Sequence, residues 1–183
     1  MDENNKNQIK IHNVVISANL FINLELEKIA KNFDRAEYEP EVFPGLIYRT
    51  IEPKANYLIF STGKIICSGT KSFELGHNAI IDLMKSLEKI GYKFTTKPKE
   101  GVVNIVASGT LNKELILDHI AFALDGCEYE PESFPGLILR LNEPHVVFLL
   151  FNSGKIVCTG ARSNEEIKLA VKNLEEKLEK NKL

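Results

Sequence analysis

Residues 38–49 read YEPEVFPGLIYR, and residues 129–140 read YEPESFPGLILR. Ten of these twelve positions are identical, and the two copies lie 91 residues apart. When residues 13–89 are compared with residues 104–180, 36 of 77 positions match without a gap. Two copies are too few for a solenoid, which needs at least three. The sequence therefore predicts a fused pseudo-dimer, in which an internal two-fold axis relates two similar halves.

The repeat also defines the predicted domain organisation of the 183 residues. Residues 1–8 are polar and are expected to form a flexible N-terminal tail. A first repeat over residues 9–91, a linker over residues 92–99 and a second repeat over residues 100–183 follow. The second repeat is acidic, with thirteen acidic and nine basic side chains, and it ends in the charged tail NLEEKLEKNKL. Each repeat has the length of a small domain.

Each half is predicted to have the element order β-α-β-β-β-β-α. In the first half, Asn23 is expected to cap a short helix. A loop broken by prolines and glycine then leads to strands and a long helix. In the second half, Ser163 and Glu166 form the S-x-x-E pattern of a capping box before an apolar helical stripe. Antiparallel strands with helices gathered on one face make an α+β fold.

The predicted strands are apolar at almost every position, although strands covered on one face should alternate apolar and polar residues. One set of alternate residues must pack under the helices, and the other set forms a second apolar face. That second face consists of Val15, Leu58, Phe60 and Ile66, matched by Val106, Leu149, Phe151 and Val157. The simplest interpretation is that the two halves, or two copies of the chain, bury these faces against each other. A contiguous apolar face otherwise marks a binding surface.

The polar side chains of this second face are hydrogen-bonding groups without charge, and cations lie toward the strand ends. The uncharged groups are Asn13, Ser17, Ser68, Asn104, Ser108 and Thr159, and the cations are Arg49, Lys64, Lys71, Arg140, Lys155 and Arg162. An apolar centre with a basic rim suits the minor groove of DNA. The floor of that groove offers acceptors at A·T pairs, and phosphates line both sides. Phenylalanines at the ends of such a face would act as wedges between base steps.

Over residues 9–180 the chain resembles the TATA-box-binding protein family of general transcription initiation factors. The resemblance rests on the strands IHNVVIS and VVNIVAS, the two YEPExFPGLIxR loops, the two Glu-Pro turns and the repeated L-x-F-x-x-G-K-I-x-C-[ST]-G pattern. It implies a two-fold pseudosymmetric saddle, built from a ten-stranded antiparallel sheet with two helices per repeat on its convex face. The halves are alike and the second is acidic, which resembles the archaeal branch of the family.

The resemblance implies a role for each of these positions. Four wedges would be Phe43, Phe60, Phe134 and Phe151, with Pro44 and Pro135 following the two loop phenylalanines. Asn13 and Asn104 would bind base acceptors, assisted by Ser68 and Thr159. The groove floor would be covered by Val15, Leu58, Ile66, Val106, Leu149 and Val157, with Ser17 and Ser108 on the same face. The six cations would hold phosphates.

The resemblance also implies protein partners. Glu130 and Glu132 in the second loop correspond to the docking point of a transcription factor B homologue, which would bring RNA polymerase indirectly. A homodimer through the concave face is a further expectation for the protein off DNA. Neither a cofactor nor a metal is expected. The expected location is the cytoplasm with the nucleoid in an archaeon, or the nucleus in a eukaryote.

Other functional classes are less well supported by the sequence. The four histidines do not repeat at 91 residues, and no metal-ligand spacing occurs. STGK and NSGK do not fit the phosphate loop G-x-x-x-x-G-K-[ST]. Cys67 and Cys158 lie in matching apolar runs, so they are expected to be buried small hydrophobes. An interaction module whose apolar sheet binds a protein or a lipid is the alternative that stays open.

Overall fold

The computed structural model describes residues 9–183, so the predicted tail over residues 1–8 lies outside the described residues. The chain forms two compact units, which are described separately below. The first unit comprises residues 13–103, and the second comprises residues 104–183 with the start of the first strand up to His12. All strands are antiparallel neighbours in one hydrogen-bonded order, β2-β3-β4-β5-β1-β6-β10-β9-β8-β7. The predicted α+β class with a ten-stranded antiparallel sheet and four helices is confirmed.

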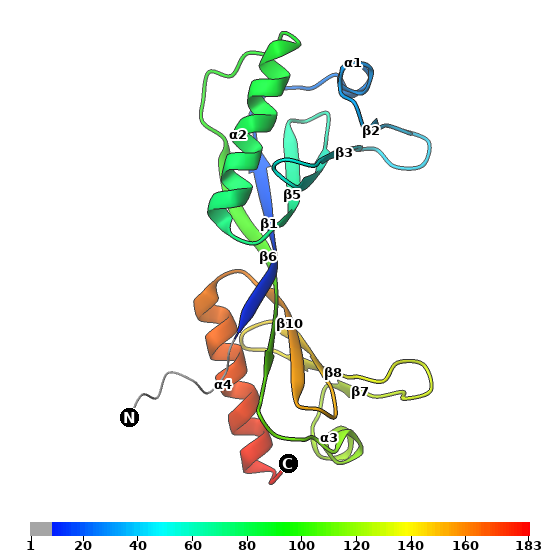
Figure 1. The fold of residues 1–183 in the computed structure, drawn as a ribbon, viewed down its shortest axis with the longest axis vertical. Helices are drawn as coiled ribbons and strands as arrows, with labels where there is room; N and C mark the ends of the chain where they lie inside the picture. Colours follow the sequence, from blue (N-terminus) through cyan, green and yellow to red (C-terminus); the bar gives the residue numbers. More distant parts are fainter. Residues whose placement is uncertain (1–8) are drawn as a thin grey trace. The chain divides into compact units, whose positions relative to one another are not determined.

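Each unit carries the predicted element order (Figure 1). The first set of elements is β1 (Lys10–Asn19), α1 (Leu26–Asn32), β2 (Ala36–Glu37), β3 (Leu46–Thr50), β4 (Ala55–Ile59), β5 (Lys64–Thr70) and α2 (Phe73–Lys89). The second set is β6 (Lys99–Thr110), α3 (Leu117–Ala123), β7 (Cys127–Glu128), β8 (Leu137–Leu141), β9 (Val146–Leu150), β10 (Lys155–Ala161) and α4 (Asn164–Lys180). Between β2 and β3, and between β7 and β8, lie the two quoted loops.

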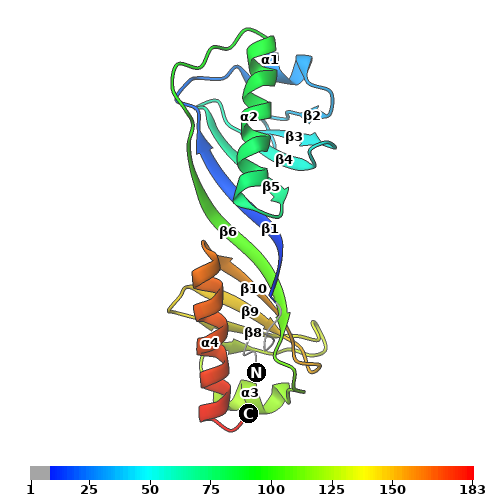
Figure 2. The same cartoon turned by 60° about the vertical axis from the view of Figure 1, so that its left-hand side comes forward.

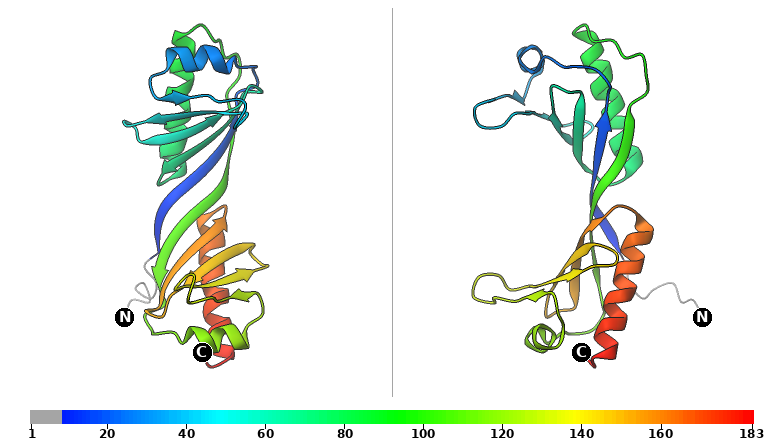
Figure 3. Two further views of the ribbon diagram at one scale, coloured as in Figure 1. Left: turned by 90° about the vertical axis from the view of Figure 1, so that its right-hand side faces the viewer. Right: turned by 180° about the vertical axis from the view of Figure 1, so that it is seen from behind.

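A long helix covers one face of the strands in each unit. In the first unit α2 lies along β1 and β5, and in the second α4 lies along β10 (Figures 2 and 3). The helix-facing strand residues are fully buried, among them Ile16, Tyr57, Cys67, Phe148 and Cys158. Burial also raises the pKa of both buried thiols to about 11. The interpretation of Cys67 and Cys158 as small core residues is therefore supported by their surroundings.

The long helices begin where the sequence indicates. The hydroxyl of Ser72 accepts from the backbone N–H of Leu75 at 3.1 Å, and that of Ser163 accepts from the N–H of Glu166 at 3.1 Å. The Glu166 carboxylate reaches the N–H of Arg162 at 2.7 Å instead of the N–H of Ser163. These bonds satisfy donors that a helix N-terminus leaves without an intrahelical partner.

The expected cap at Asn23 is wrong. The helix α1 begins at Leu26 with Glu25 at the capping position, and no side chain caps it. The N–H of Leu24 donates to the carbonyl of Ser61 at 2.8 Å. This bond ties the backbone at residue 24 to the turn between β4 and β5. Glu25 is also extended, with φ of −84° and ψ of 96°, so the helical backbone begins at Leu26.

The two helix–sheet contacts exchange a large and a small residue. In the first unit Gly76 of α2 lies directly on Ile16 of β1, and a Cβ at Gly76 would overlap the Ile16 side chain. The corresponding residues of the second unit are Ile167 on α4 and Ala107 on β6, and both are buried. The bulk is thus supplied by the strand in one unit and by the helix in the other. This exchange explains a glycine in the first turn of a long helix, a residue type that favours helices less than alanine does.

We expect Ile16→Ala to lower the free energy of unfolding by about 2–5 kcal/mol, because it leaves a cavity in the core. Gly76→Ile alone should also destabilise, since it overpacks the same contact. The double variant reproduces the Ala107–Ile167 arrangement and should recover most of the loss. Urea unfolding of the four proteins measures this coupling. Strictly additive losses in the double variant would contradict the exchange.

Candidate nucleic-acid interface

The first unit has a sheet face that no helix covers, opposite α2. We call this face, and its counterpart opposite α4 in the second unit, the helix-free face of each unit. In β1 the buried residues Val14, Ile16 and Ala18 alternate with half-buried Val15 and Ser17. Leu58 on β4 pairs with Ile66 on β5, and both are half-buried. Alternate residues of these strands therefore form a partly open apolar surface.

The second unit repeats this surface position by position. Val106 and Ser108 of β6 pair with Thr159 and Val157 of β10, and Val157 pairs in turn with Leu149 of β9. All five are half-buried, whereas the residues between them are buried. The sequence-predicted floor residues thus lie together on the helix-free face of their own unit.

The predicted asparagine readers are held by a kink in the neighbouring strand. The backbone N–H of Gly69 donates to Oδ1 of Asn13 at 2.7 Å, and the N–H of Gly160 donates to Oδ1 of Asn104 at 2.7 Å. Both glycines lie where the strand register shifts, with φ of +89° and +104°. In the second unit, Thr159 Oγ1 also donates to Asn104 Oδ1, at 3.3 Å.

This geometry fixes which end of the amide is presented. Because Oδ1 already accepts a hydrogen bond, the Nδ2 amino group of Asn13 and of Asn104 is the polar group left for a ligand. An amino group is a donor, and donors are what the A·T minor groove requires, since it offers the acceptors A N3 and T O2. The kink in the neighbouring strand thus determines that each asparagine presents its Nδ2 amino group on the helix-free face.

The predicted wedges meet in pairs within each unit. The rings of Phe43 and Phe60 lie edge to face with centroids 6.0 Å apart, and those of Phe134 and Phe151 do the same at 6.0 Å. A Cβ at Gly45 would come within 2.7 Å of the Phe43 ring, and the corresponding glycine in the second loop is equally close to Phe134. The Pro-Gly of each loop therefore allows the loop ring to pack against the strand ring. Pro44 and Pro135, which precede these glycines, are both exposed.

The six predicted rim cations are exposed, but two of them already have partners. Arg49 forms an ion pair with Glu37 at 2.6 Å, and Arg140 forms one with Glu128 at 3.2 Å. The side chains of both pairs are at least half exposed, so each pair contributes at most about 1 kcal/mol to the free energy of unfolding. Four rim cations form no ion pair within residues 9–183, and these are Lys64, Lys71, Lys155 and Arg162.

Sequence reasoning missed several residues on these faces. Ile47 pairs with Leu58, and Ile138 pairs with Leu149, so both isoleucines belong to the helix-free faces. Their alternation within the apolar runs after each loop could have identified them. His12 was also missed, and its Nε2 lies 2.6 Å from the hydroxyl of Ser108. Its place in the repeat is taken by a valine, so no repeated pattern signals it.

The acidic ends of the two loops are open to solvent. Glu130 and Glu132 are exposed, and the carbonyl of Glu130 accepts from the N–H groups of Ser133 and Phe134 at 2.9 Å. The same turn occurs in the first loop, where the carbonyl of Glu39 accepts two bonds. These bonds hold the base of each turn and leave the carboxylates free to meet a partner.

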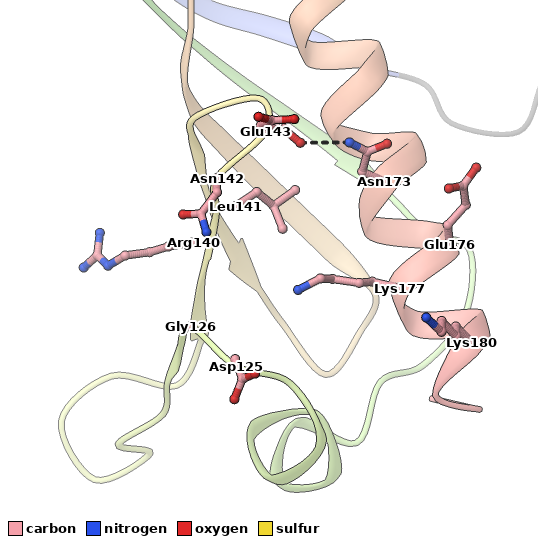
Figure 4. A pocket seen from close by; sticks show the side chains of 10 residues that line it. All are labelled: Asp125, Gly126, Arg140, Leu141, Asn142, Glu143, Asn173, Glu176, Lys177 and Lys180. Atoms are coloured by element: carbon pink, nitrogen blue, oxygen red, sulfur yellow. Dashed lines mark hydrogen bonds between the residues drawn. The ribbon is translucent and has the colours of Figure 1, made fainter.

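A separate hollow of about 780 Å³ opens in the second unit between α4, the β8–β9 turn and the segment before β7 (Figure 4). Lys177 projects into it, and Asn173 Nδ2 donates to the carbonyl of Glu143 at 2.9 Å. The matching hollow of the first unit holds about 310 Å³, where Tyr48 and Tyr57 stack with centroids 5.6 Å apart. Acidic and basic side chains both line the larger hollow, so its chemistry favours no single class of ligand.

The part of the chain that the structure describes, residues 9–183, has no group of three or more histidine, cysteine or acidic side chains arranged to hold a metal ion. No helix in it is long and apolar enough to cross a membrane.

The chain is similar to known proteins over most of its length. The family model of Transcription factor TFIID (or TATA-binding protein, TBP) matches residues 8–90 and again residues 100–181. The TATA-box-binding protein of Thermococcus kodakarensis is 47% identical over 173 residues, covering 94% of this chain and 91% of the relative. That of Archaeoglobus fulgidus is 46% identical, covering 93% and 94%. The solved structure of Methanococcus jannaschii TBP superposes with a TM-score of 0.88 at 45% identity, covering 94% of this chain and 98% of that one.

Gly69→Ala tests the strand kink. A side chain at a φ of +89° is strained, so the free energy of unfolding should fall by about 1–3 kcal/mol. The Asn13 amide should also lose its fixed orientation, because its N–H partner must move. Thermal unfolding and the side-chain amide resonances of Asn13 measure both effects. An alanine variant with wild-type stability and an unshifted Asn13 resonance would rule out this role for Gly69.

Proposed function

The chain belongs to the TATA-binding protein family of transcription factors, which are not enzymes, and on that premise we propose that it binds and bends the minor groove of A·T-rich promoter DNA. It then nucleates the initiation complex by recruiting a transcription factor B homologue and, through it, RNA polymerase. The observation that carries the proposal is the pair of asparagines whose Nδ2 groups are left as donors on a half-open apolar face.

The chemistry of the face fits an A·T minor groove better than a G·C one. A G·C pair adds a protruding N2 amino group to the groove floor, which would oppose the asparagine donors and the surrounding valines and isoleucines. Binding of a labelled A·T-rich duplex, compared with a G·C-rich duplex of equal length, tests the proposal directly. Equal affinity for the two duplexes would refute minor-groove reading.

A second occupant of the same surface is another copy of this chain. The half-buried residues of the helix-free faces, such as Leu58 and Leu149, would be covered in a homodimer formed off DNA. Such a dimer competes with DNA because both use one surface. Sedimentation with and without an A·T-rich duplex separates the two states.

Bending should depend on the loop phenylalanines. Unstacking a base step costs a few kcal/mol, a figure from minor-groove proteins that include this family, and wider contact with the bent duplex offsets it. Phe43→Ala and Phe134→Ala should each weaken binding and reduce the bend. Phe134 is 38% exposed, so its removal should leave the fold intact. Fluorescence energy transfer across the duplex measures the bend, and an unchanged bend in either variant would exclude the wedge role.

Salt dependence should report the basic rim. Six phosphate contacts at about −0.9 each predict a slope of log K against log salt near −5. If Arg49 and Arg140 stay paired with Glu37 and Glu128 on DNA, four contacts remain and the slope falls to about −3.6. Replacing both glutamates by glutamine should then steepen it. A slope near zero would mean that the rim does not face phosphates.

Recruitment of the partner should depend on the second loop. Reversal of Glu130 and Glu132 to lysine should abolish the ternary complex with the transcription factor B homologue, because the carboxylates are exposed and serve no internal bond of the described residues. Binding to DNA should change little. The matched control reverses Glu39 and Glu41 in the first loop. Normal ternary-complex formation by the second-loop variant would contradict this assignment.

A further inference from the structure

An exposed apolar stripe runs along α3 of the second unit. It consists of Ile116, His119 and Phe122, which are spaced three residues apart and therefore lie on neighbouring turns of one side of the helix. Phe122 is 96% exposed and Ile116 is 60% exposed. The core contacts of this helix are made by other residues, Leu117 and Ile120, which are 1% exposed. The fold therefore does not require the stripe.

The first unit has charged residues at the same three positions. Glu25, Lys28 and Lys31 replace Ile116, His119 and Phe122 in the repeat. This side of α1 is also partly occupied by the chain itself, because the Tyr92 hydroxyl accepts from the N–H of Glu25 at 2.9 Å and Lys28 lies 4.9 Å over the Tyr92 ring. The apolar stripe thus occurs in one unit and not in its otherwise similar counterpart.

The stripe lies next to the acidic loop of the same unit. The helix α3 packs against β7, and β7 leads directly into the loop that carries Glu130 and Glu132 (Figure 1). Residues 114–139 contain six acidic side chains and no lysine or arginine. The corresponding residues 23–48 contain six acidic and three basic side chains. The chain segment that carries the stripe and the loop is therefore acidic, whereas the nearby cations Arg140 and Lys177 come from β8 and α4.

We propose that the stripe is a second docking contact for the protein that binds the acidic loop, so this inference rests on the proposed function. The partner presents a basic patch to Glu130 and Glu132 and an apolar pocket to Phe122. Charge complementarity with the acidic surroundings steers the partner to this unit, and burial of the phenylalanine holds it there. The charged side chains of α1 in the first unit exclude the same partner.

The test transplants the residues of α1 into the full-length chain. The stripe variant is Ile116→Glu with Phe122→Lys, and the loop variant reverses Glu130 and Glu132 to lysine. Leu169→Lys on α4 is the control, because Leu169 is also apolar and 50% exposed in the same unit but lies on another helix. Two affinities are measured for each variant. The first is that of the protein for an A·T-rich duplex, and the second is that of the transcription factor B homologue from the same genome for the protein–DNA complex.

The stripe variant should keep its thermal stability and bind DNA within about twofold of wild type, while its affinity for the partner falls at least tenfold. The control should match wild type in all three measurements. If the loop variant loses the partner and the stripe variant does not, the stripe inference is overturned and the proposed function stands. If only the stripe variant loses it, the stripe is the docking site and the loop assignment falls. If neither loses it, both are overturned.

Discussion

The fold depends on one constraint, which is that each unit has a single long helix to cover its strands. In the first unit α2 covers one face of the sheet and buries the strand residues that point to it, including Ile16, Tyr57 and Cys67. Helix α4 does the same in the second unit. The alternate strand residues, which point to the opposite face, are nearly as apolar, but no helix covers that face. A half-open surface of valine, leucine and isoleucine is typical of a site that binds another molecule. The binding face is therefore a direct consequence of covering a strongly apolar sheet on one side only.

The repeat preserves the helix-free face more strictly than the core. On that face the glycine kinks, the asparagines and the phenylalanine pairs recur with almost the same distances, 2.7 Å for the asparagine bonds and 6.0 Å for the ring pairs. In the core, by contrast, the contact of Ile16 with Gly76 has become one of Ala107 with Ile167. A core needs only a filled volume, which either partner can supply. A face that binds duplex DNA, as proposed here, must keep its contact residues at the same positions in both units.

Much of the fold could be predicted from the sequence, because each helix and strand occurs twice and its two copies can be compared. The parity of the strands followed from alternation, and it placed Val15, Leu58 and Ile66 on the correct face. The failed cap at Asn23 has a different cause, since the segment before α1 is held by bonds from Leu24 to Ser61 and from Glu25 to Tyr92, which join residues far apart in the chain. The hydrogen bond that Oδ1 of Asn13 accepts could not be predicted either, because it depends on a register shift in another strand. Phe122 could have been identified as exposed, because it lies outside the i, i+3, i+7 stripe formed by Leu117, Ile120 and Leu124.

The ion pairs on the rim show how binding can be strong without being indiscriminate. Arg49 and Arg140 are held by Glu37 and Glu128 in the free protein, and these exposed pairs cost little to exchange for a phosphate. The glutamates also lower the positive potential that would attract any nucleic acid. The formal net charge of −2 has the same effect on the whole chain. In the proposed complex, affinity for DNA comes mainly from apolar contact and from the two asparagine donors. These are the interactions that distinguish an A·T groove from other surfaces of DNA.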